Sequence, residues 1–558
     1  MQKYPKREKR ETMKEEKELT FNSIINKSAA EFSDKHALSF LGETTYTYRD
    51  VFENIKSLVA FFENLGIGKK DRIAILGPNS PNWVISYLAT TYMGATAVPV
   101  LHDFSPDEVN SILEHSEARA MLVSSNLYSN KAKYPSGLKH IINLDDFSML
   151  RKGDGKAEFS LKVQSEKTYK VDPDDLAAII YTSGTTGNSK GVMLSNKNII
   201  SNAFMGKELK HIDKNDRFLS ILPLAHTFEN TIGMVIPFIS GSSIYYLRKP
   251  PTAPVLLPAL SEVRPTIMLS VPLIIEKIYF NKIKPAFEEK SLIRFLHRLP
   301  PLRILLHRAA GKKLMHTFGD EITFFGIGGA KLNPEVDRFL KEARFPYAIG
   351  YGLTESSPLI AGMVHPNCKV ESTGSACEGV EIKLHNPDPV TGEGEVWARG
   401  SNIMKGYYKN PEKTREVLTD DGWLRTGDLG KFDKSGYLYI RGRLKNVIIG
   451  SSGENIYPEE IESIINTFKH VAESLVIEKG GKLVAMVHIN REEIEEKYKH
   501  LKDEMTRVVE EKIEEIITEL NHQVNQRLNR FSRIHQFVLQ PVPFQKTPTR
   551  KIKRYLYS

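Results

Sequence analysis

Short runs of apolar residues, bounded by glycine, proline and polar turns, alternate with stretches of helical periodicity through most of this chain. The amphipathic pattern of residues 45–65 predicts a helix, and residues 71–76 after it predict a buried strand. Further short apolar strands are predicted at residues 95–100, 121–124, 140–143, 218–222, 267–270 and 322–325. Helical patterns lie between several of them, an order typical of parallel sheets covered by helices. We therefore expect an α/β fold.

The pattern changes near residue 380. Residues 380–384, 394–399 and 437–441 alternate apolar and polar positions, and glycine-rich turns separate them. This spacing predicts a small β-rich subdomain over about residues 375–442.

The remaining boundaries follow from charge and periodicity. Residues 1–20 are dominated by Lys, Arg and Glu and predict a flexible tail, residues 21–444 predict the N-terminal domain, and residues 445–558 predict a small α+β domain. Apolar positions between Ile494 and Leu528 recur every three to five residues, which predicts one long amphipathic helix or a helix pair that packs on a core. A coiled-coil dimer is the alternative, but the heptad is interrupted near Lys512.

Composition fits this picture and narrows the partners. A chain of 558 residues holds more than one domain by the usual prior. Lys and Arg outnumber Asp and Glu by 77 to 68, a net charge of +9 that suits nucleotides, an acidic partner protein or an anionic membrane. No arginine-rich arm, zinc-finger spacing or aromatic RNA-binding run is present, so we expect no nucleic-acid partner.

The sequence shows no clear targeting segment and only two cysteines. The N-terminal residues lack the apolar core of a secretory signal, which predicts a cytoplasmic protein. Residues 81–101 are uncharged, but their polar residues, Gly94 and Pro99 favour a buried helix leading into a core strand over a membrane span. The two cysteines, Cys368 and Cys377, have neither metal-site nor disulfide spacing and are expected to be buried, inert thiols.

The most informative run is YTSGTTGNSKG at residues 181–191, which lies between two apolar strand patterns. Its glycines allow close approach of the backbone to an anion, its hydroxyls donate hydrogen bonds, and its lysine adds charge. The candidate phosphate-binding residues are Thr182, Ser183, Gly184, Thr185, Thr186, Gly187 and Lys190. The run differs from the P-loop of kinases and GTPases, because Ser189 replaces its second glycine and Gly191 its hydroxyl residue. A turn without a ligand is the alternative for the run alone.

Five further segments follow this run in a fixed order. They are LPLAHT at residues 222–227, GIGGA at 326–330, YGLTE at 351–355, TGD at 426–428 and GR at 442–443, with Lys551 near the end of the chain. Each alone could be a turn, a solvated carboxylate or a basic tail. Together they resemble the core motifs of the AMP-forming acyl-CoA synthetase superfamily, the adenylate-forming enzymes, from about residue 40 onward. The likeness is closest to the long-chain fatty acid–CoA ligases.

This resemblance implies a nucleotide site for ATP. Glu355, with Thr182, would hold Mg²⁺, and Thr354 would face the α-phosphate. Asp428 and Arg443 would bind the ribose. The adenine would lie against Tyr351, Gly352, Gly328, Gly329 and Ala330.

The resemblance also implies a two-step reaction with a mobile C-terminal lid. Lys551 would bridge the acid and ATP during adenylation, Lys445 would be the hinge of the lid, and His226 would lie between the acid pocket and the thiol tunnel. Three positions depart from the usual motifs: Ile327 before the paired glycines, Arg550 before Lys551, and Ser452 in the lid.

The implied reaction joins a long-chain fatty acid to coenzyme A, with residues 222–237 as one wall of the alkyl slot. An acidic acyl carrier protein is the alternative acceptor, and a non-catalytic nucleotide-binding protein on this fold is the alternative of a different class. Residues 291–313 mix arginines with Leu, Ile and Phe, which favours either peripheral contact with an anionic membrane or an ordinary basic insertion.

Overall fold

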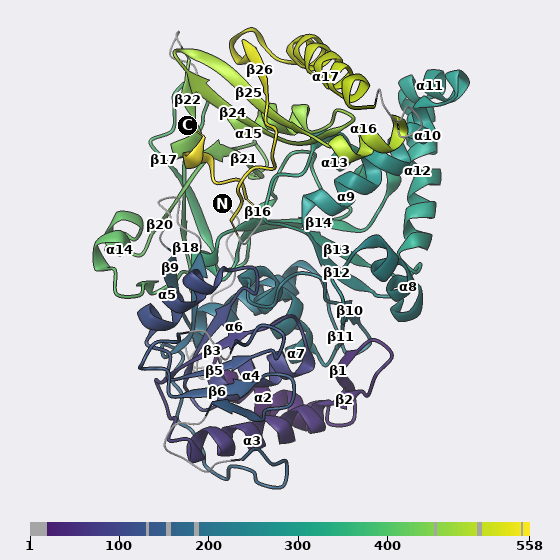
Figure 1. The fold of residues 1–558 in the computed structure, drawn as a ribbon. Coiled ribbons are helices and arrows are strands. Elements are labelled where there is room, and N and C mark those ends of the chain that lie inside the picture. The colour runs from purple at the N-terminus through teal and green to yellow at the C-terminus, as the bar shows by residue number, and fades with distance from the viewer. Residues whose placement is uncertain are drawn as a thin grey trace.

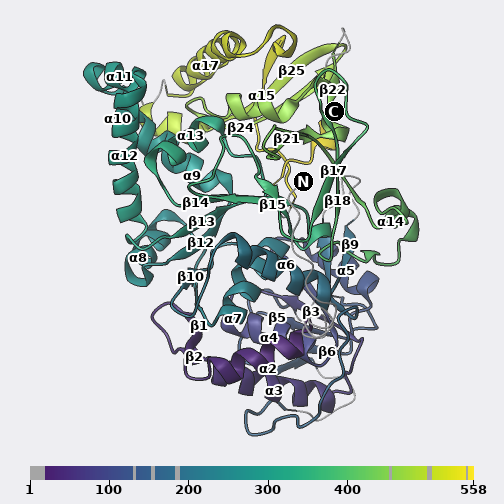
Figure 2. The same ribbon diagram turned by 180° about the vertical axis from the view of Figure 1, so that it is seen from behind.

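The computed structural model describes residues 19–129, 133–151, 158–182, 189–450, 455–498, 505–547 and 551–557. Two large sheets with their helices form the body of the N-terminal domain, and the C-terminal domain lies across one end of it (Figure 1). The reverse view shows the same arrangement (Figure 2).

The first sheet has the strand order β19-β9-β8-β4-β3-β5-β6-β7. Its strands are β3 (Arg72–Leu76), β4 (Thr96–Val100), β5 (Ala120–Val123), β6 (His140–Asn143), β7 (Met149–Arg151), β8 (Leu176–Thr182), β9 (Lys190–Ser195) and β19 (Gly406–Tyr407). Its central pairs are parallel, whereas β8 and β9 pair antiparallel across the phosphate-loop run.

The helices of this half are α2 (Phe21–Glu31), α3 (Tyr48–Asn64), α4 (Pro81–Tyr92), α5 (Pro106–Ser116) and α6 (Asn196–Leu209). Helix α4 contacts β3 and β4 of the first sheet and β1 of the second, and nearly all of its residues are buried. The uncharged stretch is therefore a core helix that leads into β4. Among the described residues, no helix is long and apolar enough to cross a membrane.

The second sheet has the order β16-β15-β14-β13-β12-β10-β11-β1-β2. Its strands are β1 (His36–Phe40), β2 (Tyr46–Thr47), β10 (Arg217–Leu219), β11 (Ser243–Tyr246), β12 (Ile267–Ser270), β13 (Phe324–Ile327), β14 (Tyr347–Gly352), β15 (Leu359–Val364) and β16 (Ser375–Ala376). From β1 through β11, β10, β12 and β13 to β14 every pair is parallel. Their carboxyl ends therefore lie along one edge of the sheet.

The helical segments of the second half follow one another between and beside these strands. They are η1 (Phe228–Val235), α7 (Ile236–Ser240), α8 (Ala253–Val263), α9 (Pro272–Ile278), η2 (Tyr279–Ile283), α10 (Lys284–Glu288), α11 (Ser291–Arg298), α12 (Pro300–Thr317), α13 (Pro334–Ala343) and η3 (Thr354–Ser356). Helices α10, α11 and α12 stand at the outer edge of the molecule in both views (Figures 1 and 2).

The β-rich subdomain is a four-stranded antiparallel sheet of order β17-β18-β20-β21. Its strands are β17 (Glu381–His385), β18 (Gly394–Arg399), β20 (Leu424–Phe432) and β21 (Leu438–Arg443), and α14 (Pro411–Val417) lies between β19 and β20 in sequence. The short segment η4 (Leu444–Asn446) follows and leads to the C-terminal domain.

The C-terminal domain has its own core, in which helices pack on a three-stranded sheet. Its elements are β22 (Ile448–Ile449), β23 (Asn455–Ile456), α15 (Pro458–Ile465), β24 (Val471–Lys479), β25 (Lys482–Ile489), α16 (Arg491–Tyr498), α17 (Met505–Arg527), η6 (Arg530–Ser532), β26 (Gln536–Leu539) and η7 (Arg554–Leu556). Two helices, α16 and α17, occupy the region where the sequence left open one helix or a pair. Val509, Ile513, Leu520 and Val524 are buried in this core, so the apolar face serves packing.

The α/β expectation is confirmed, and the differences are at element ends. The helix predicted from residue 45 begins at Tyr48, because residues 46–47 pair with β1 and Thr47 caps the helix in a capping box with Asp50. The strand predicted over 218–222 ends at Leu219, and the one predicted over 322–325 is shifted to Phe324–Ile327. Periodicity fixes the type of a short apolar run better than its ends.

Candidate active site

A cleft of about 3370 Å³ lies beside the edge where β10, β13 and β14 end and extends to the C-terminal domain. Three of the predicted segments come to it directly from these strand ends: 222–227 after β10, 328–330 after β13 and 351–355 at the end of β14. Open parallel sheets bind ligands outside the carboxyl ends of their strands. The sheet topology therefore gathers motifs that are more than a hundred residues apart.

Asp428 and Arg443 form an ion pair in the cleft. They lie opposite each other in the antiparallel register of β20 and β21, and Arg443 Nε is 2.8 Å from Asp428 Oδ1. The second carboxylate oxygen, Oδ2, accepts a hydrogen bond of 2.7 Å from the hydroxyl of Tyr351 on β14. The predicted ribose pair and the predicted adenine residue are thus linked through one carboxylate.

The electrostatics of this cluster follow from its burial. Burial raises the pKa of Asp428, and the Arg443 guanidinium and the Tyr351 hydroxyl counter part of that rise. Burial, and then the Asp428 charge, raises the pKa of Tyr351 well above its ordinary value, so the phenol keeps its proton and donates a hydrogen bond to the carboxylate.

Glycines line the wall beside this cluster, where a side chain would crowd its neighbours or strain the backbone. A Cβ on Gly352 would lie 1.8 Å from the Pro358 carbonyl oxygen, and Gly329 has a φ of +86°. Gly328 lies against the Phe228 ring, which a Cβ would meet at 3.2 Å. Ala330 continues this wall into the cleft lining.

Glu355 is held at the start of η3 by a residue that the sequence did not single out. The Tyr407 hydroxyl donates to Glu355 Oε1 at 2.8 Å, and the backbone N–H of Met404 donates to the Glu355 carbonyl. No hydrogen-bond partner of Oε2 is found within the described part of the chain. A carboxylate with one oxygen fixed and one available suits a hard divalent cation, and Thr354 and Thr182 line the same cleft.

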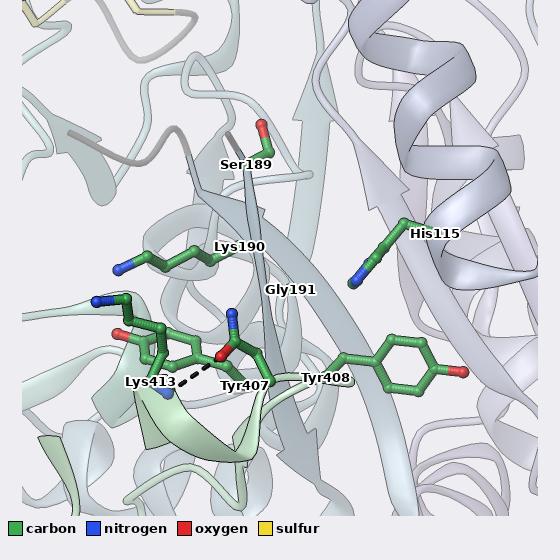
Figure 3. A pocket seen from close by; sticks show the side chains of 8 residues that line it. His115, Ser189, Lys190, Gly191, Tyr407, Tyr408 and Lys413 are labelled. Carbon is green, nitrogen blue, oxygen red and sulfur yellow. Dashed lines mark hydrogen bonds between the residues drawn. The ribbon is translucent and has the colours of Figure 1, made fainter. Parts of the chain in front are cut away.

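Only the two ends of the phosphate-loop run are described. Thr182 ends β8 and Lys190 begins β9, whereas Ser183, Gly184, Thr185, Thr186 and Gly187 lie outside the described residues. Lys190 lies 5.1 Å above the ring of Tyr407 and ends near the Lys413 side chain (Figure 3). Burial, and then the Lys413 charge, lowers the pKa of Lys190. Two cations so close together favour an anion between them.

Lys551 is presented to the cleft by a short hairpin at the end of the chain. Lys546 and Ile552 pair in an antiparallel bridge, and the Thr547 N–H donates to the Lys551 carbonyl at 2.8 Å. Arg554 fixes the end of this hairpin to the domain, because its Nη1 lies 2.8 and 2.9 Å from the two oxygens of Glu462.

The Lys551 amino group lies where the predicted site residues converge. Water reaches the side chain, yet protein atoms surround the amino group, and this desolvation and then the Arg443 charge lower its pKa. Asp428 and Glu355 act in the opposite direction. The same ammonium charge also acts on His226, so Lys551 is within electrostatic reach of all four residues.

His226 lies two residues before the start of η1, and its imidazole is neutral. Burial, and then the Lys551 charge, lowers its pKa to about 4. The N–H of Phe228 lies 3.4 Å from His226 Nδ1. Phe228 packs against Gly328, and both His226 and Phe228 line the cleft.

Lys445 lies in η4, between the last strand of the N-terminal body and the first strand of the C-terminal domain. The two domains touch beyond it through Lys331 Nζ and Glu460 Oε1, 3.1 Å apart, and through Asn333 and Ser463. Arg441 Nη1 also lies 3.0 Å from Glu460 Oε1, so polar contacts and this short segment join the two domains here.

Both cysteines are buried, and burial raises the pKa of each thiol to about 12. Neither has thiolate character at neutral pH, as the sequence analysis expected.

One buried acid near the cleft was not predicted. Glu229 accepts a hydrogen bond of 2.5 Å from Ser220 at Oε1, and no partner of its Oε2 is found in the described residues. Burial raises its pKa from 4.5 to about 8. An acidic residue within the apolar run after His226 was the signal available in the sequence.

Glu229 makes a prediction for stability. The folded protein keeps this proton up to about pH 8, whereas the unfolded chain releases it near pH 4.5, so stability falls as pH rises between these values. The side chain of Glu229→Gln cannot ionise, so this variant should avoid roughly 3 to 5 kcal/mol of the decrease in the free energy of unfolding between these pH values. We expect the variant to unfold at a higher temperature than the parent at pH 8, with a smaller difference at pH 5.5, in scanning calorimetry.

Other titrating groups are common to both proteins and cancel in this comparison. Glu289→Gln, an exposed carboxyl, is the matched control and should follow the parent. Parallel curves of unfolding temperature against pH for the parent and Glu229→Gln would show that Glu229 is ionised in the folded state.

The chain is similar to known proteins over most of its length. The sequence pattern of the AMP-binding enzyme family matches residues 25–408, and that of the AMP-binding enzyme C-terminal domain matches residues 445–556. The chain is 28% identical to a long-chain-fatty-acid–CoA ligase of Gallus gallus, over 86% of this chain and 68% of that protein. It is also 28% identical to a chloroplastic long-chain-fatty-acid–acyl-carrier-protein ligase of Arabidopsis thaliana, over 91% of this chain and 80% of that protein.

The fold is similar to that of a solved structure. The o-succinylbenzoate–CoA synthetase of Bacillus subtilis, in complex with ATP and magnesium ion, superimposes with a TM-score of 0.74 and 22% identity. The match covers 95% of this chain and 98% of that chain.

Proposed function

The chain belongs to the AMP-binding enzyme family, the adenylate-forming enzymes, and on that premise we propose that it ligates a long-chain fatty acid to coenzyme A through an acyl-adenylate. One observation carries the proposal. The Lys551 ammonium, the Asp428–Arg443 pair and the Glu355 carboxylate share one cleft with His226. A cation, a sugar-binding carboxylate and a metal-binding carboxylate are the groups that activation of an acid by ATP requires.

The first step is in-line attack of the acid carboxylate on the α-phosphorus of ATP. A new P–O bond forms, the bond to pyrophosphate breaks, and acyl-AMP and pyrophosphate result. Negative charge grows on the phosphoryl oxygens, where the Lys551 ammonium and the Thr354 hydroxyl stabilise it. The carboxylate of Asp428 accepts hydrogen bonds from the ribose, and Arg443 and Tyr351 keep that carboxylate in place.

Mg²⁺, when bound, neutralises charge on the phosphates. The residues present fit it, because Glu355 keeps one oxygen available while Tyr407 fixes the other, and the Thr182 hydroxyl lies at the same cleft. Lys190, Lys413 and the phosphate-loop run would bind the β- and γ-phosphates and leaving pyrophosphate.

In the second step the thiol sulfur of coenzyme A attacks the acyl carbonyl carbon, AMP leaves, and the thiol proton is released. Rotation about Lys445 would withdraw Lys551 and admit the thiol to the same acyl group. His226 remains neutral at physiological pH because its pKa is about 4, so it lines the path between acid and thiol without adding charge.

The choice of a fatty acid rests on the apolar wall. Of the predicted wall at residues 222–237, Leu222, Ala225 and Phe228 line the cleft, whereas residues 230–237 are absent from its lining. Phe228 packs on Gly328, and the similarity to a long-chain-fatty-acid–CoA ligase extends over most of the chain. The acceptor has a second candidate, an acyl carrier protein, because a ligase with that acceptor is equally similar and this chain carries a net charge of +9.

Acid-dependent exchange of labelled pyrophosphate into ATP tests the first step without any thiol. With Mg²⁺ present, we expect exchange with long-chain fatty acids to exceed exchange with acetate or aromatic acids by at least about tenfold, because each buried methylene favours binding by about 0.8 kcal/mol. Thioester formation with coenzyme A and with a carrier protein, measured side by side, then distinguishes the acceptors.

A peak of exchange with another acid class would overturn the fatty acid assignment and leave adenylation standing. Absence of exchange with every acid, in protein that binds ATP, would favour a non-catalytic nucleotide-binding protein.

A further inference from the structure

Helices α11 and α12 form a protruding corner that the proposed reaction does not use. The corner stands at the outer edge of the molecule in both views (Figures 1 and 2). Residues 291–317 contain four Arg, two Lys and three His and no acidic residue. The sequence left this stretch open between a membrane surface and an ordinary basic insertion.

Helix α11 carries an exposed apolar stripe. Leu292 is 68% exposed and Phe295 59%, and Leu299, directly after the helix, is 40% exposed. Spacings of three and four residues place these side chains on one face. On α12, Leu305 is 58% exposed. None of the residues of α11 is buried, so a core does not require this stripe. Large apolar side chains gathered on a surface mark a contact with another apolar phase.

Basic side chains flank the stripe. Arg294 and Arg298 are exposed on α11, and Arg308 and Lys312 are exposed on the face of α12 that carries Leu305. Within the described residues, none of these four is in an ion pair. The acidic residues nearest in sequence, Glu288 and Glu289, line the cleft.

Arg303 differs from the other arginines of the corner. Its Nε and Nη2 donate to the two oxygens of Glu342 on α13, at 3.0 and 2.7 Å. This pair is largely buried and fastens α12 to the body. Arg303 is therefore a structural residue and is not part of the exposed basic surface. Arg294 is exposed, and its Nε donates to the Glu288 carbonyl at 3.1 Å.

The inner side of the corner is held by aromatic and imidazole contacts. The rings of His297 and Phe287 stack with centroids 4.8 Å apart, and His297 Nε2 lies 2.9 Å from His307 Nε2. His307 in turn lies 2.9 Å from Glu342. These contacts attach α11 from its inner face, so the outer stripe can be changed without loss of its support.

The corner also adjoins the cleft. Phe280, Lys284 and Glu288, which lead into α11, line the same cleft as Lys551. A partner surface bound to this corner would therefore lie close to one end of the cleft.

We propose that the α11–α12 corner docks on an anionic lipid bilayer. Leu292, Phe295 and Leu305 enter the boundary between headgroups and acyl chains, and Arg294, Arg298 and Arg308 bind lipid phosphates. A protruding pair of helices that carries apolar and basic side chains and, over residues 291–317, no acidic ones matches a planar anionic interface. The proposal does not depend on which acid or acceptor the enzyme uses.

The test is co-sedimentation of the full chain with phosphatidylcholine vesicles, with and without phosphatidylglycerol. We expect the parent to bind the anionic vesicles more strongly. Leu292→Ser with Phe295→Ser should lower the vesicle partition coefficient at least tenfold, and so should Arg294→Gln with Arg298→Gln and Arg308→Gln, since each cation near such a surface contributes about a factor of five.

The matched control carries Lys35→Gln, Lys139→Gln and Lys214→Gln, which make the same charge change at exposed sites outside the corner. It should bind vesicles like the parent, and all variants should retain pyrophosphate exchange with a soluble acid. Equal vesicle binding by the corner variants and the parent would overturn the proposal. So would weak vesicle binding by the parent together with corner-dependent binding of an acidic acyl carrier protein, which would assign the surface to a protein.

Discussion

Lys551→Ala is expected to slow acyl-adenylate formation by about 10²- to 10³-fold, the usual cost of losing one positioned donor to a developing oxyanion. The amino group lies in the cleft with Asp428, Glu355 and Arg443, and its hairpin is anchored by Arg554 and Glu462. Removal of the Lys551 side chain leaves this anchor intact. Adenylation is measured as pyrophosphate exchange, and thioester formation is measured separately from preformed acyl-AMP.

The second half-reaction should be largely spared, because the proposed rotation removes Lys551 before the thiol arrives. Lys553→Ala is the matched control, since Lys553 lies two residues away on the same hairpin, and its backbone N–H, which bonds to the Gln545 carbonyl, is unchanged. Equal losses in both half-reactions would refute the role of Lys551 in adenylation alone and indicate a structural defect.

Lys445→Pro should have the opposite pattern. Proline fixes φ near −65° and restricts the preceding residue, which limits rotation about this segment. It is tolerated in the first turn of a helix, and Lys445 lies in the first turn of η4, so the arrangement with Lys551 in the cleft should persist. We expect thioester formation from preformed acyl-AMP to fall about a hundredfold, the effect of a misplaced reacting group, with pyrophosphate exchange within about threefold of the parent.

Lys445→Ala removes the same charge and keeps the backbone free, so it should retain both half-reactions. Full-rate thioester formation by Lys445→Pro would exclude this residue as the hinge. Loss of exchange in both variants would instead assign the Lys445 side chain to the nucleotide site.

The local sequence was enough for most of the element types. Apolar runs such as residues 267–270 became β12 without change, and the alternation at residues 394–399 became β18. Strand and helix periods are properties of neighbouring residues, so they can be seen in the sequence. The predicted start of the helix at residue 45 was wrong because residues 46–47 pair with the preceding strand, β1, a hairpin contact that helical periodicity does not reveal.

The chemical groups of the site were also visible in the sequence, but their contacts were not. Nothing in the segments themselves predicts that Tyr351 donates to Asp428, 77 residues away, or that Tyr407 holds Glu355. The ion pair of Asp428 with Arg443 depends on the register of β20 and β21. A one-residue slip of register would turn one of these side chains to the other face of the sheet.

The sequence by itself determined which elements form and which residues carry charge, hydroxyl groups or no side chain, because these follow from local propensity and composition. Only the tertiary structure decided which of them meet. It brought Lys551 to the cleft, buried Glu229 so that its pKa rises to about 8, and tied Arg303 to Glu342 while the stripe of α11 stayed exposed. Such contacts depend on the packing of many distant residues at once, and burial then sets the protonation of each group.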